Sequence, residues 1–401
     1  MNVEIIYTTS IAKAMPYPIL FDVLIILGAA TVLGEVFEQF GLPHVIGELL
    51  AGIVIGPTVL KLLMPSPELT ALSSIAVFFI IFLIGLEMNT EMLRRNIARS
   101  TIISLTSFII PVIPLFFISY FLFPFGLTAD FILVLAICVP SISIVSVMVM
   151  RLQLVQKITG QIILSSVIVS DIIAFVLLAL FTQSFMGILY TVLYLVIFAV
   201  VFILIDRLIN YRVRAFRRLL EYSSGFLKRE GTPYAILIII GLIVSIATQY
   251  IGISYILGAF FTGLIVHEGI VGKESYTNIT RTFEVMNRSF FIPIFFGISG
   301  LQAELRLYNF YTLSIFAIIV AADIIISFSL SYIASKRMLG MTDGSSAKII
   351  SSILGGRGAV GIIIATLAFG LNLINQTAYS LILLGTMIIS FVTPLAIRSR
   401  G

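Results

Sequence analysis

Residues 158–182 read ITGQIILSSVIVSDIIAFVLLALFT, a long apolar run with one charged residue, Asp171, near its middle. About 20 consecutive apolar residues are enough for a helix to cross a lipid bilayer. A carboxyl group at the centre of such a segment is costly to insert, so an ionisable residue there indicates a function by default. The stretch therefore predicts a transmembrane helix, and it makes Asp171 the first candidate for a functional site.

The whole chain has the composition of a membrane protein. It has 401 residues, of which 60% are hydrophobic and 11% are charged, with a mean hydropathy of +1.16. Soluble domains carry about 25% charged residues. Similar apolar runs recur along the chain and predict about 13 transmembrane helices in a single all-α, polytopic unit, 1–401. The predicted spans are 20–40, 44–63, 71–88, 100–123, 129–150, 158–182, 186–209, 233–250, 253–268, 289–304, 311–335, 346–370 and 376–397.

Basic residues predict the orientation of these spans. With the N-terminus outside and an odd number of spans, the cytoplasmic loops hold most of the 24 lysines and arginines, as the positive-inside rule requires. The longest and most basic of these loops is 210–232. We therefore expect a multi-pass protein of the cell membrane with a cytoplasmic C-terminus. The high pI of about 9.3 reflects topology, and we expect membrane lipid but no nucleic acid as a partner.

The odd number of spans also suggests internal symmetry. Residues 1–182 and 233–401 form two predicted halves of about six spans each, of opposite orientation, joined by a linker helix at 186–209. This arrangement suits an inverted-repeat transporter.

Helix-breaking residues occur at mid-depth in the fifth and twelfth spans. The fifth holds Pro140 within Val139–Ser143, and proline removes a helical hydrogen bond. The twelfth holds Gly355, Gly356 and Gly358 around Arg357, and glycine leaves helical geometry cheaply. Paired broken helices in corresponding positions of two halves are a sequence indication of a transporter's binding site.

These features together suggest a site for a monovalent cation. Backbone carbonyls freed at the breaks, with the hydroxyls of Ser141 and Ser143, can replace part of a cation's hydration shell. Asp171 would supply the net charge. Because removal from water disfavours a charged carboxyl group, Asp171 can hold a proton or a cation, but not both well. That competition is enough to couple opposite fluxes of the two ions.

Two other charged residues lie near the middle of predicted spans. We expect Arg357 to be a structural or conformational partner of Asp323 or Asp171 rather than an ion ligand. Asp323 suits either a structural ion pair or a proton pathway. It begins a row at steps of four with Ser327, Ser331 and Ser335, which either lines an inward funnel or bonds to its own helix backbone.

Five motifs resemble those of the cation:proton antiporter superfamily, in its Kef-type and NapA-type branch. They are Gly41–Pro57 (GLPHVIGELLAGIVIGP), Phe82–Glu87 (FLIGLE), Leu257–Gly263 (LGAFFTG), Phe295–Leu301 (FFGISGL) and Gly356–Val360 (GRGAV). The resemblance implies a thirteen-helix inverted-repeat fold with two crossed broken helices and a homodimer. It also implies exchange of Na⁺ or K⁺ for protons and a role in pH homeostasis.

The resemblance assigns the ion site to Asp171. In the family the preceding residue is Asp, Asn or Gln, whereas here it is Ser170. A single acid at this place favours electroneutral, one-for-one exchange. The family's membrane-embedded lysine of the eleventh span has no counterpart, and the central charge there is Asp323. The cytosolic nucleotide-binding domain of Kef members is not expected, since the chain stops at Gly401.

Other functions stay open at this point. A cation channel, or a transporter of an organic anion on a similar fold, is the main alternative. We expect no enzyme activity and no cofactor beyond the transported Na⁺ or K⁺ and H⁺, because the sequence shows no paired catalytic acids of protease type and no His or Cys cluster with metal-ligand spacing. The sequence does not choose between Na⁺, K⁺ and Li⁺.

Overall fold

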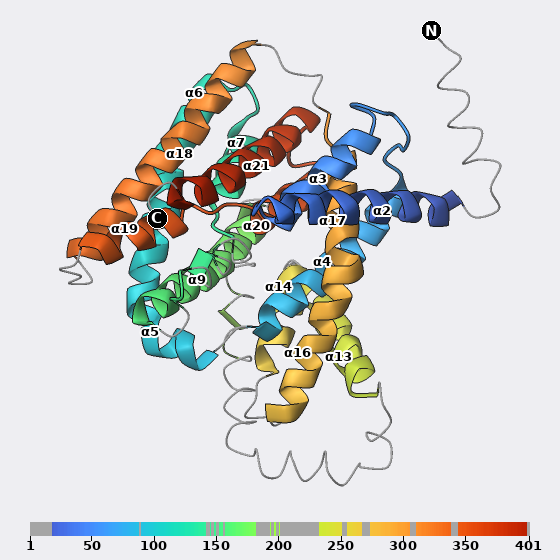
Figure 1. Ribbon diagram of the computed structural model, residues 1–401, viewed down its shortest axis with the longest axis horizontal. Coiled ribbons are helices and arrows are strands. Elements are labelled where there is room, and N and C mark those ends of the chain that lie inside the picture. The colour runs from blue at the N-terminus through green and yellow to red at the C-terminus, as the bar shows by residue number, and fades with distance from the viewer. Residues whose placement is uncertain are drawn as a thin grey trace. The chain divides into compact units, whose positions relative to one another are not determined.

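The computed structural model describes residues 18–87, 90–141, 145, 148–149, 152–154, 157–181, 193, 196–197, 200, 232–250, 255–266, 273–304, 310–337 and 344–398. Within these ranges every regular element is a helix (Figure 1), so the all-α prediction is confirmed for the described part of the chain. In chain order the helices are α2 (Pro18–Gln39), α3 (His44–Ile55), α4 (Pro67–Glu87), α5 (Thr90–Ser104), η1 (Leu105–Ile109), α6 (Ile110–Leu122), α7 (Leu127–Cys138), α9 (Ile158–Phe181), α13 (Thr232–Tyr250), α14 (Tyr255–Ile265), α16 (Lys273–Met286), η2 (Asn287–Phe291), α17 (Ile292–Leu301), α18 (Phe310–Arg337), α19 (Gly344–Ile353), α20 (Ala359–Gly370) and α21 (Gln376–Arg398).

Many of these helices are apolar enough for a bilayer. Five described helical segments have both the length and the composition to cross one: Ile19–Gln39, Pro67–Glu87, Asn96–Leu122, Ile158–Leu178 and Phe310–Arg337. Several further apolar helices have only 10–17 residues, among them α7 and α20. The total of about 13 spans stays a prediction, because most of the predicted linker helix 186–209 lies outside the described residues.

One predicted span lies within a longer run of helix. The sequence predicts the tenth span at 289–304, and α16, η2 and α17 follow one another without a gap from Lys273 to Leu301. The first part, KESYTNITRTFEVM, is amphipathic and on average polar, so the apolar-run criterion missed it.

By packing, the chain divides into two compact units. Unit 1 consists of Met1–Ser73, Met92–Ala174 and Pro293–Gly401, and unit 2 consists of Ser74–Glu91 and Phe175–Ile292. Each unit draws on both predicted halves, 1–182 and 233–401. The halves describe a proposed repeat rather than a packing unit, so they stay a prediction.

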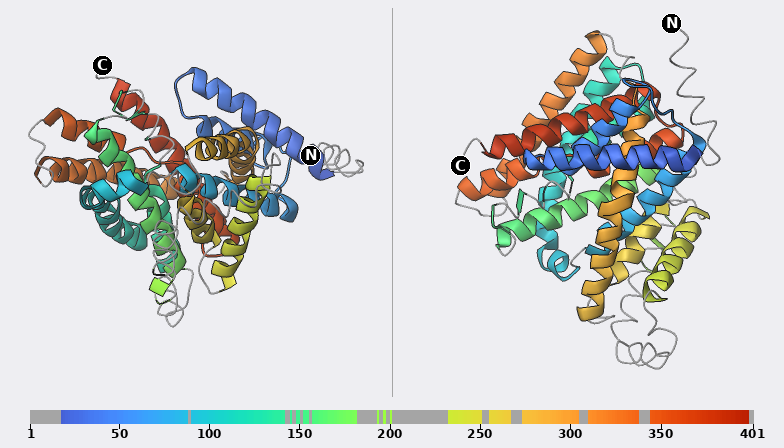
Figure 2. Two further views of the ribbon diagram at one scale, coloured as in Figure 1. Left: turned by 90° about the horizontal axis from the view of Figure 1, so that it is seen from below. Right: turned by 45° about the vertical axis from the view of Figure 1, so that its right-hand side comes forward.

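Unit 1 carries the broken helices and most of the buried charges. In it α6 and α18 lie side by side (Figures 1 and 2). A cluster of buried apolar side chains ties α5, α9, α18 and α19 together around one end of the fifth span: Ile103, Val145, Met148, Val149, Leu154, Ile162, Ile163, Val167, Ala334, Ile350, Ile353 and Leu354. This packing fixes the N-terminal half of α9, the helix that bears Asp171.

Unit 2 has an aromatic core of its own. Phe79 stacks on Phe291 with ring centroids 4.2 Å apart, and Phe82 lies against Phe283 with centroids 5.0 Å apart. Offset aromatic pairs at such distances contribute stabilisation beyond their buried area.

Candidate functional site

The two predicted helix breaks meet in unit 1. Helix α7 ends at Cys138, and residues 354–358 separate α19 from α20. Pro140 and Arg357 pair as an isolated antiparallel β-bridge, and the Ser141 N–H donates to the Gly356 carbonyl at 2.8 Å. The breaks of the fifth and twelfth predicted spans therefore exist, and they lie against each other.

We call the contact between residues 139–141 and residues 354–358 the crossing. Its backbone groups are largely paired by hydrogen bonds. Proline has no N–H to satisfy, so Pro140 suits the interrupted position. Further bonds run from Val139 N to Leu135 O at 3.1 Å, from Val145 N to Ser141 O at 3.0 Å and from Gly356 N to Ile353 O at 3.0 Å. Ser390 Oγ donates to the carbonyl of Arg357. Irregular backbone at membrane depth persists only where such partners or water exist, and here protein groups supply them.

Glycine permits the close approach of α7 and α20. A Cβ atom on Gly361 would lie 2.1 Å from the Ala136 carbonyl oxygen, far inside van der Waals contact. Any other side chain at this position would push the two half-helices apart.

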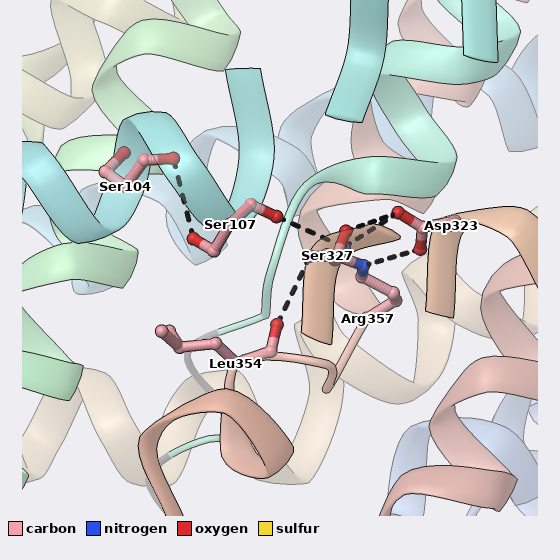
Figure 3. Close-up of polar contacts among 6 residues, drawn as sticks. All are labelled: Ser104, Ser107, Asp323, Ser327, Leu354 and Arg357. Atoms are coloured by element: carbon pink, nitrogen blue, oxygen red, sulfur yellow. Dashed lines mark hydrogen bonds and ion pairs between the residues drawn. The ribbon is translucent and has the colours of Figure 1, made fainter. Parts of the chain in front are cut away.

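Arg357 and Asp323 form a buried, bidentate ion pair (Figure 3). The guanidinium donates from Nε to Asp323 Oδ2 at 3.1 Å and from Nη2 to Oδ1 at 2.9 Å. It also donates to Ser327 Oγ at 2.8 Å and to the Ser107 carbonyl at 3.4 Å, and Ser327 Oγ donates to Asp323 Oδ1 at 2.8 Å. The sequence left the partner of Arg357 open between two acids, and the structure identifies it as Asp323.

Asp171 stands in a different environment. It lies in the middle of α9 with 0% exposure. Neither of its carboxylate oxygens has a hydrogen-bond partner among the described residues. Burying a carboxylate in this way is costly unless a proton or a cation neutralises it. Asp171 is therefore suited to bind one of the two.

The serines proposed beside Asp171 occupy distinct places. Ser170 Oγ donates to the Ser166 carbonyl at 3.0 Å and shares a 2.8 Å hydrogen bond with Ser104 Oγ. Ser141 is fully buried, and its backbone N–H takes part in the crossing. Ser143 lies outside the described residues.

Comparison with known proteins decides the family. The family model described as "Sodium/hydrogen exchanger, transmembrane" matches residues 23–399, nearly the whole chain. The chain belongs to this sodium/hydrogen exchanger family. The prediction of a polytopic cation:proton antiporter fold is thereby confirmed, and the family places the chain among transporters.

Two curated relatives match this chain over nearly their full lengths. The chain is 28% identical to the Na⁺/H⁺ antiporter NhaS4 of Synechocystis, over 95% of this chain and 96% of that protein. It is 28% identical to the Na⁺/H⁺-K⁺ antiporter GerN of Bacillus cereus, over 95% of each. A solved structure of the sodium proton antiporter MjNhaP1 from Methanocaldococcus jannaschii superposes with a TM-score of 0.65 at 14% identity, covering 98% of this chain and 96% of that one. This last likeness shows the exchanger fold.

Two serines of this exchanger that the sequence did not single out form a hydrogen-bonded path from Arg357 to Ser170. Ser104 bonds Ser170, the neighbour of Asp171, and Ser107 Oγ donates weakly to the Ser104 carbonyl at 3.5 Å. The Ser107 carbonyl in turn accepts from Arg357 (Figure 3). Ser107 lies in η1, a π-helical turn, and such turns are frequent at functional sites. The signal available in the sequence was the helical spacing of the serines at 100, 104 and 107.

The polar row on α18 supports the ion pair. Asp323, Ser327, Ser331 and Ser335 are all buried, with exposures of 0–2%. Ser327 bonds Asp323, and Ser335 Oγ donates to the Ser331 carbonyl at 2.7 Å. Ser327 therefore supports the pair and Ser335 bonds its own helix, whereas Ser331 Oγ has no hydrogen-bond partner among the described residues. Because all four side chains are buried in this structure, the row does not line an open funnel in it.

Proposed function

We propose that this chain is a secondary antiporter that exchanges Na⁺, or K⁺, for protons at Asp171. The observation that carries the proposal is the contrast between its two central buried acids. Asp323 is neutralised by Arg357, whereas Asp171 has no partner among the residues described. The names of the relatives support this ion class: they include Na⁺/H⁺ antiporters, the Na⁺/H⁺-K⁺ antiporter GerN and the K⁺/H⁺ antiporter 1 of Saccharomyces cerevisiae.

The coupling follows from the energetics of a buried carboxylate. An unpaired ion costs several kcal/mol to hold in a protein interior. Asp171 is neutral when it carries either a proton or a monovalent cation, so both loaded forms tolerate burial. The empty form carries an uncompensated charge, so it is disfavoured in the occluded state. The protein then changes its access mainly when loaded, and one ion must leave before the other enters.

The crossing supplies further ligands in this proposal. The Ser141 and Ser143 hydroxyls and the carbonyls at the two breaks, each of which has two lone pairs, are hard oxygen donors, which suit alkali cations. Ser170 also remains a site residue in the proposal. A hydroxyl has one donor and two acceptor positions, so Ser170 keeps acceptor capacity after donating to Ser166.

The stoichiometry is proposed as one cation for one proton. Ser170 adds no charge beside Asp171, and the Arg357–Asp323 pair has no net charge. One titrating carboxyl group would therefore exchange one positive charge for another. We further propose a homodimer in the cell membrane, with the N-terminus outside and the C-terminus in the cytoplasm.

The test uses purified protein in proteoliposomes with an enclosed pH-sensitive dye. Addition of Na⁺ or K⁺ to wild type should drive proton movement, and Asp171→Asn should abolish it. Asp130→Asn is the matched control, because Asp130 is equally buried in unit 1 but accepts a 2.7 Å hydrogen bond from Ser119. Undiminished exchange in Asp171→Asn would reject the proposed site.

An imposed membrane potential tests the stoichiometry in the same vesicles. Electroneutral exchange should proceed at the same rate with and without the potential. A clear acceleration would show that net charge moves in each cycle.

A further inference from the structure

A second group of ionisable side chains gathers where α2 ends and α3 begins in unit 1. Glu35 and Glu38 lie on the last turns of α2, His44 is the first residue of α3, and Glu48 follows one turn later. The chain reverses through Gly41, whose φ of 77° lies in the left-handed region that favours glycine. The Gly41 N–H donates to the Glu38 carbonyl at 2.8 Å, which closes the end of α2. The turn thereby brings His44 back against α2.

A glycine on α2 makes room for the imidazole. A Cβ atom on Gly34 would lie 2.3 Å from His44 Nδ1 and 2.7 Å from Cε1. The ring therefore lies directly on the backbone of α2, and this contact restricts its orientation.

Both ring nitrogens of His44 face carboxylates. Nδ1 lies 3.5 Å from Glu48 Oε1, while Nε2 lies 3.4 Å from Glu35 Oε1 and 3.1 Å from Glu38 Oε2. Glu35 and Glu38 are exposed, at 62% and 63%, so an ion can reach them from water. Glu48 is 3% exposed, and its second oxygen has no partner among the described residues. Three carboxyl groups surround one imidazole ring, which leaves more acidic groups than His44 alone can pair.

The geometry around Nε2 matches a metal site. Bonds of about 2.0–2.1 Å to zinc at tetrahedral angles place neighbouring ligand atoms about 3.3 Å apart. The distances from Nε2 to the two carboxylates, 3.1 and 3.4 Å, agree with that spacing. The ligand atoms of all three residues lie within 4.8 Å of one another.

Glu48 completes the arrangement. A histidine that ligates a metal usually donates its other N–H to a carboxylate, which fixes the tautomer and the orientation of the ring. The position of Glu48 at Nδ1 would leave the lone pair on Nε2, on the side of Glu35 and Glu38.

We propose that Glu35, Glu38 and His44 bind a divalent transition-metal ion such as Zn²⁺, with Glu48 as the buried carboxylate that orients His44. An imidazole with two carboxylates suits Zn²⁺ or Co²⁺ better than Mg²⁺ or Ca²⁺, which prefer all-oxygen sites. The site shares no residue with the proposed exchange site at Asp171, and it links the ends of two consecutive helices. A bound ion would stabilise the corner between α2 and α3.

The test is metal binding by the full chain in detergent after treatment with a chelator. Equilibrium dialysis against Zn²⁺ should show saturable binding of about one ion per chain at a site with three protein ligands. Co²⁺ in its place should give the intense visible absorption of tetrahedral coordination. His44→Gln and Glu38→Gln should each weaken binding at least tenfold, and Glu48→Gln should weaken it about 10–100-fold.

Glu68→Gln is the matched control, because Glu68 is an exposed acid in unit 1 outside the cluster. It should leave the affinity unchanged. Cation:proton exchange and the gel-filtration profile show whether each variant is folded. Because the Glu38 side chain is exposed, Glu38→Gln is not expected to disturb folding. The proposal is overturned if the chain shows no saturable Zn²⁺ binding. It is also overturned if His44→Gln and Glu38→Gln bind Zn²⁺ with wild-type affinity, or if the site prefers Mg²⁺ or Ca²⁺.

Discussion

The buried pair between Arg357 and Asp323 allows a quantitative test of what stabilises the crossing. Its side chains are 0% and 1% exposed and share two hydrogen bonds. Removing one partner of such a pair leaves an uncompensated buried charge and costs about 3–5 kcal/mol. We expect Asp323→Leu and Arg357→Met each to lower the free energy of unfolding by that amount. The double variant should lose less than the sum, because neither charge remains.

The chain offers its own probe for this measurement. It has no tryptophan and one cysteine, Cys138, which is buried at the end of α7 beside the crossing. Labelling of Cys138 by a thiol-reactive dye during a denaturant or temperature series therefore reports opening, and circular dichroism follows the helices in parallel.

A surface pair serves as the control. Arg288 and Glu284 lie 2.8 Å apart on one helix face, with side chains 75% and 37% exposed. Exposed pairs at this spacing contribute about 0.3–0.5 kcal/mol, so Glu284→Gln should change stability little. Two results would contradict this expectation. One is an equal loss of unfolding free energy in the surface and buried variants, and the other is a strictly additive loss for the substitutions at 323 and 357. A large change in the KM for the cation, in an Arg357→Met variant of normal stability, would also contradict it.

Two further predictions concern the packing and the charge at the site. Gly361→Ala should destabilise the fold by about 1–3 kcal/mol through overpacking against the Ala136 carbonyl, whereas Gly370→Ala, with no neighbouring atom within 4 Å of its added Cβ, should not. Thermal unfolding of the purified variants measures both stabilities. Equal unfolding temperatures of the two variants would contradict the close contact of α7 and α20. Ser170→Ala should lower the free energy of unfolding by about 1 kcal/mol, because the hydrogen bonds of Ser170 are lost. The exchange rate of this variant should stay insensitive to an imposed membrane potential. Flux assays at clamped potential measure that rate, and a voltage-dependent rate would contradict the prediction.

Local features of the sequence predicted the parts of the fold that depend on local physics. Pro140 and the glycines around Arg357 interrupt helices whatever surrounds them, so both breaks were found. The central position of Asp171 was visible because one charge stands out in an apolar run.

Features that depend on packing between distant helices were not predictable in the same way. Asp323 precedes Arg357 by 34 residues, and only the arrangement of α18 shows which acid the guanidinium meets. Ser104 and Ser107 were missed because serines in apolar helices commonly bond their own backbone. The metal-like spacing around His44 depends on the turn at Gly41 and on the contact with Gly34, neither of which composition reveals.

In the proposed exchange, one carboxyl group, that of Asp171, holds either a proton or a cation. The most direct measurement is the number of protons that the purified protein releases on Na⁺ binding, in weakly buffered detergent solution with a pH dye. At a pH where the Na⁺-free site is protonated, competitive binding at a single carboxyl predicts release of about one proton per chain in wild type and none in Asp171→Asn. Cation binding without proton release in wild type, or equal release in the variant, would contradict the claim.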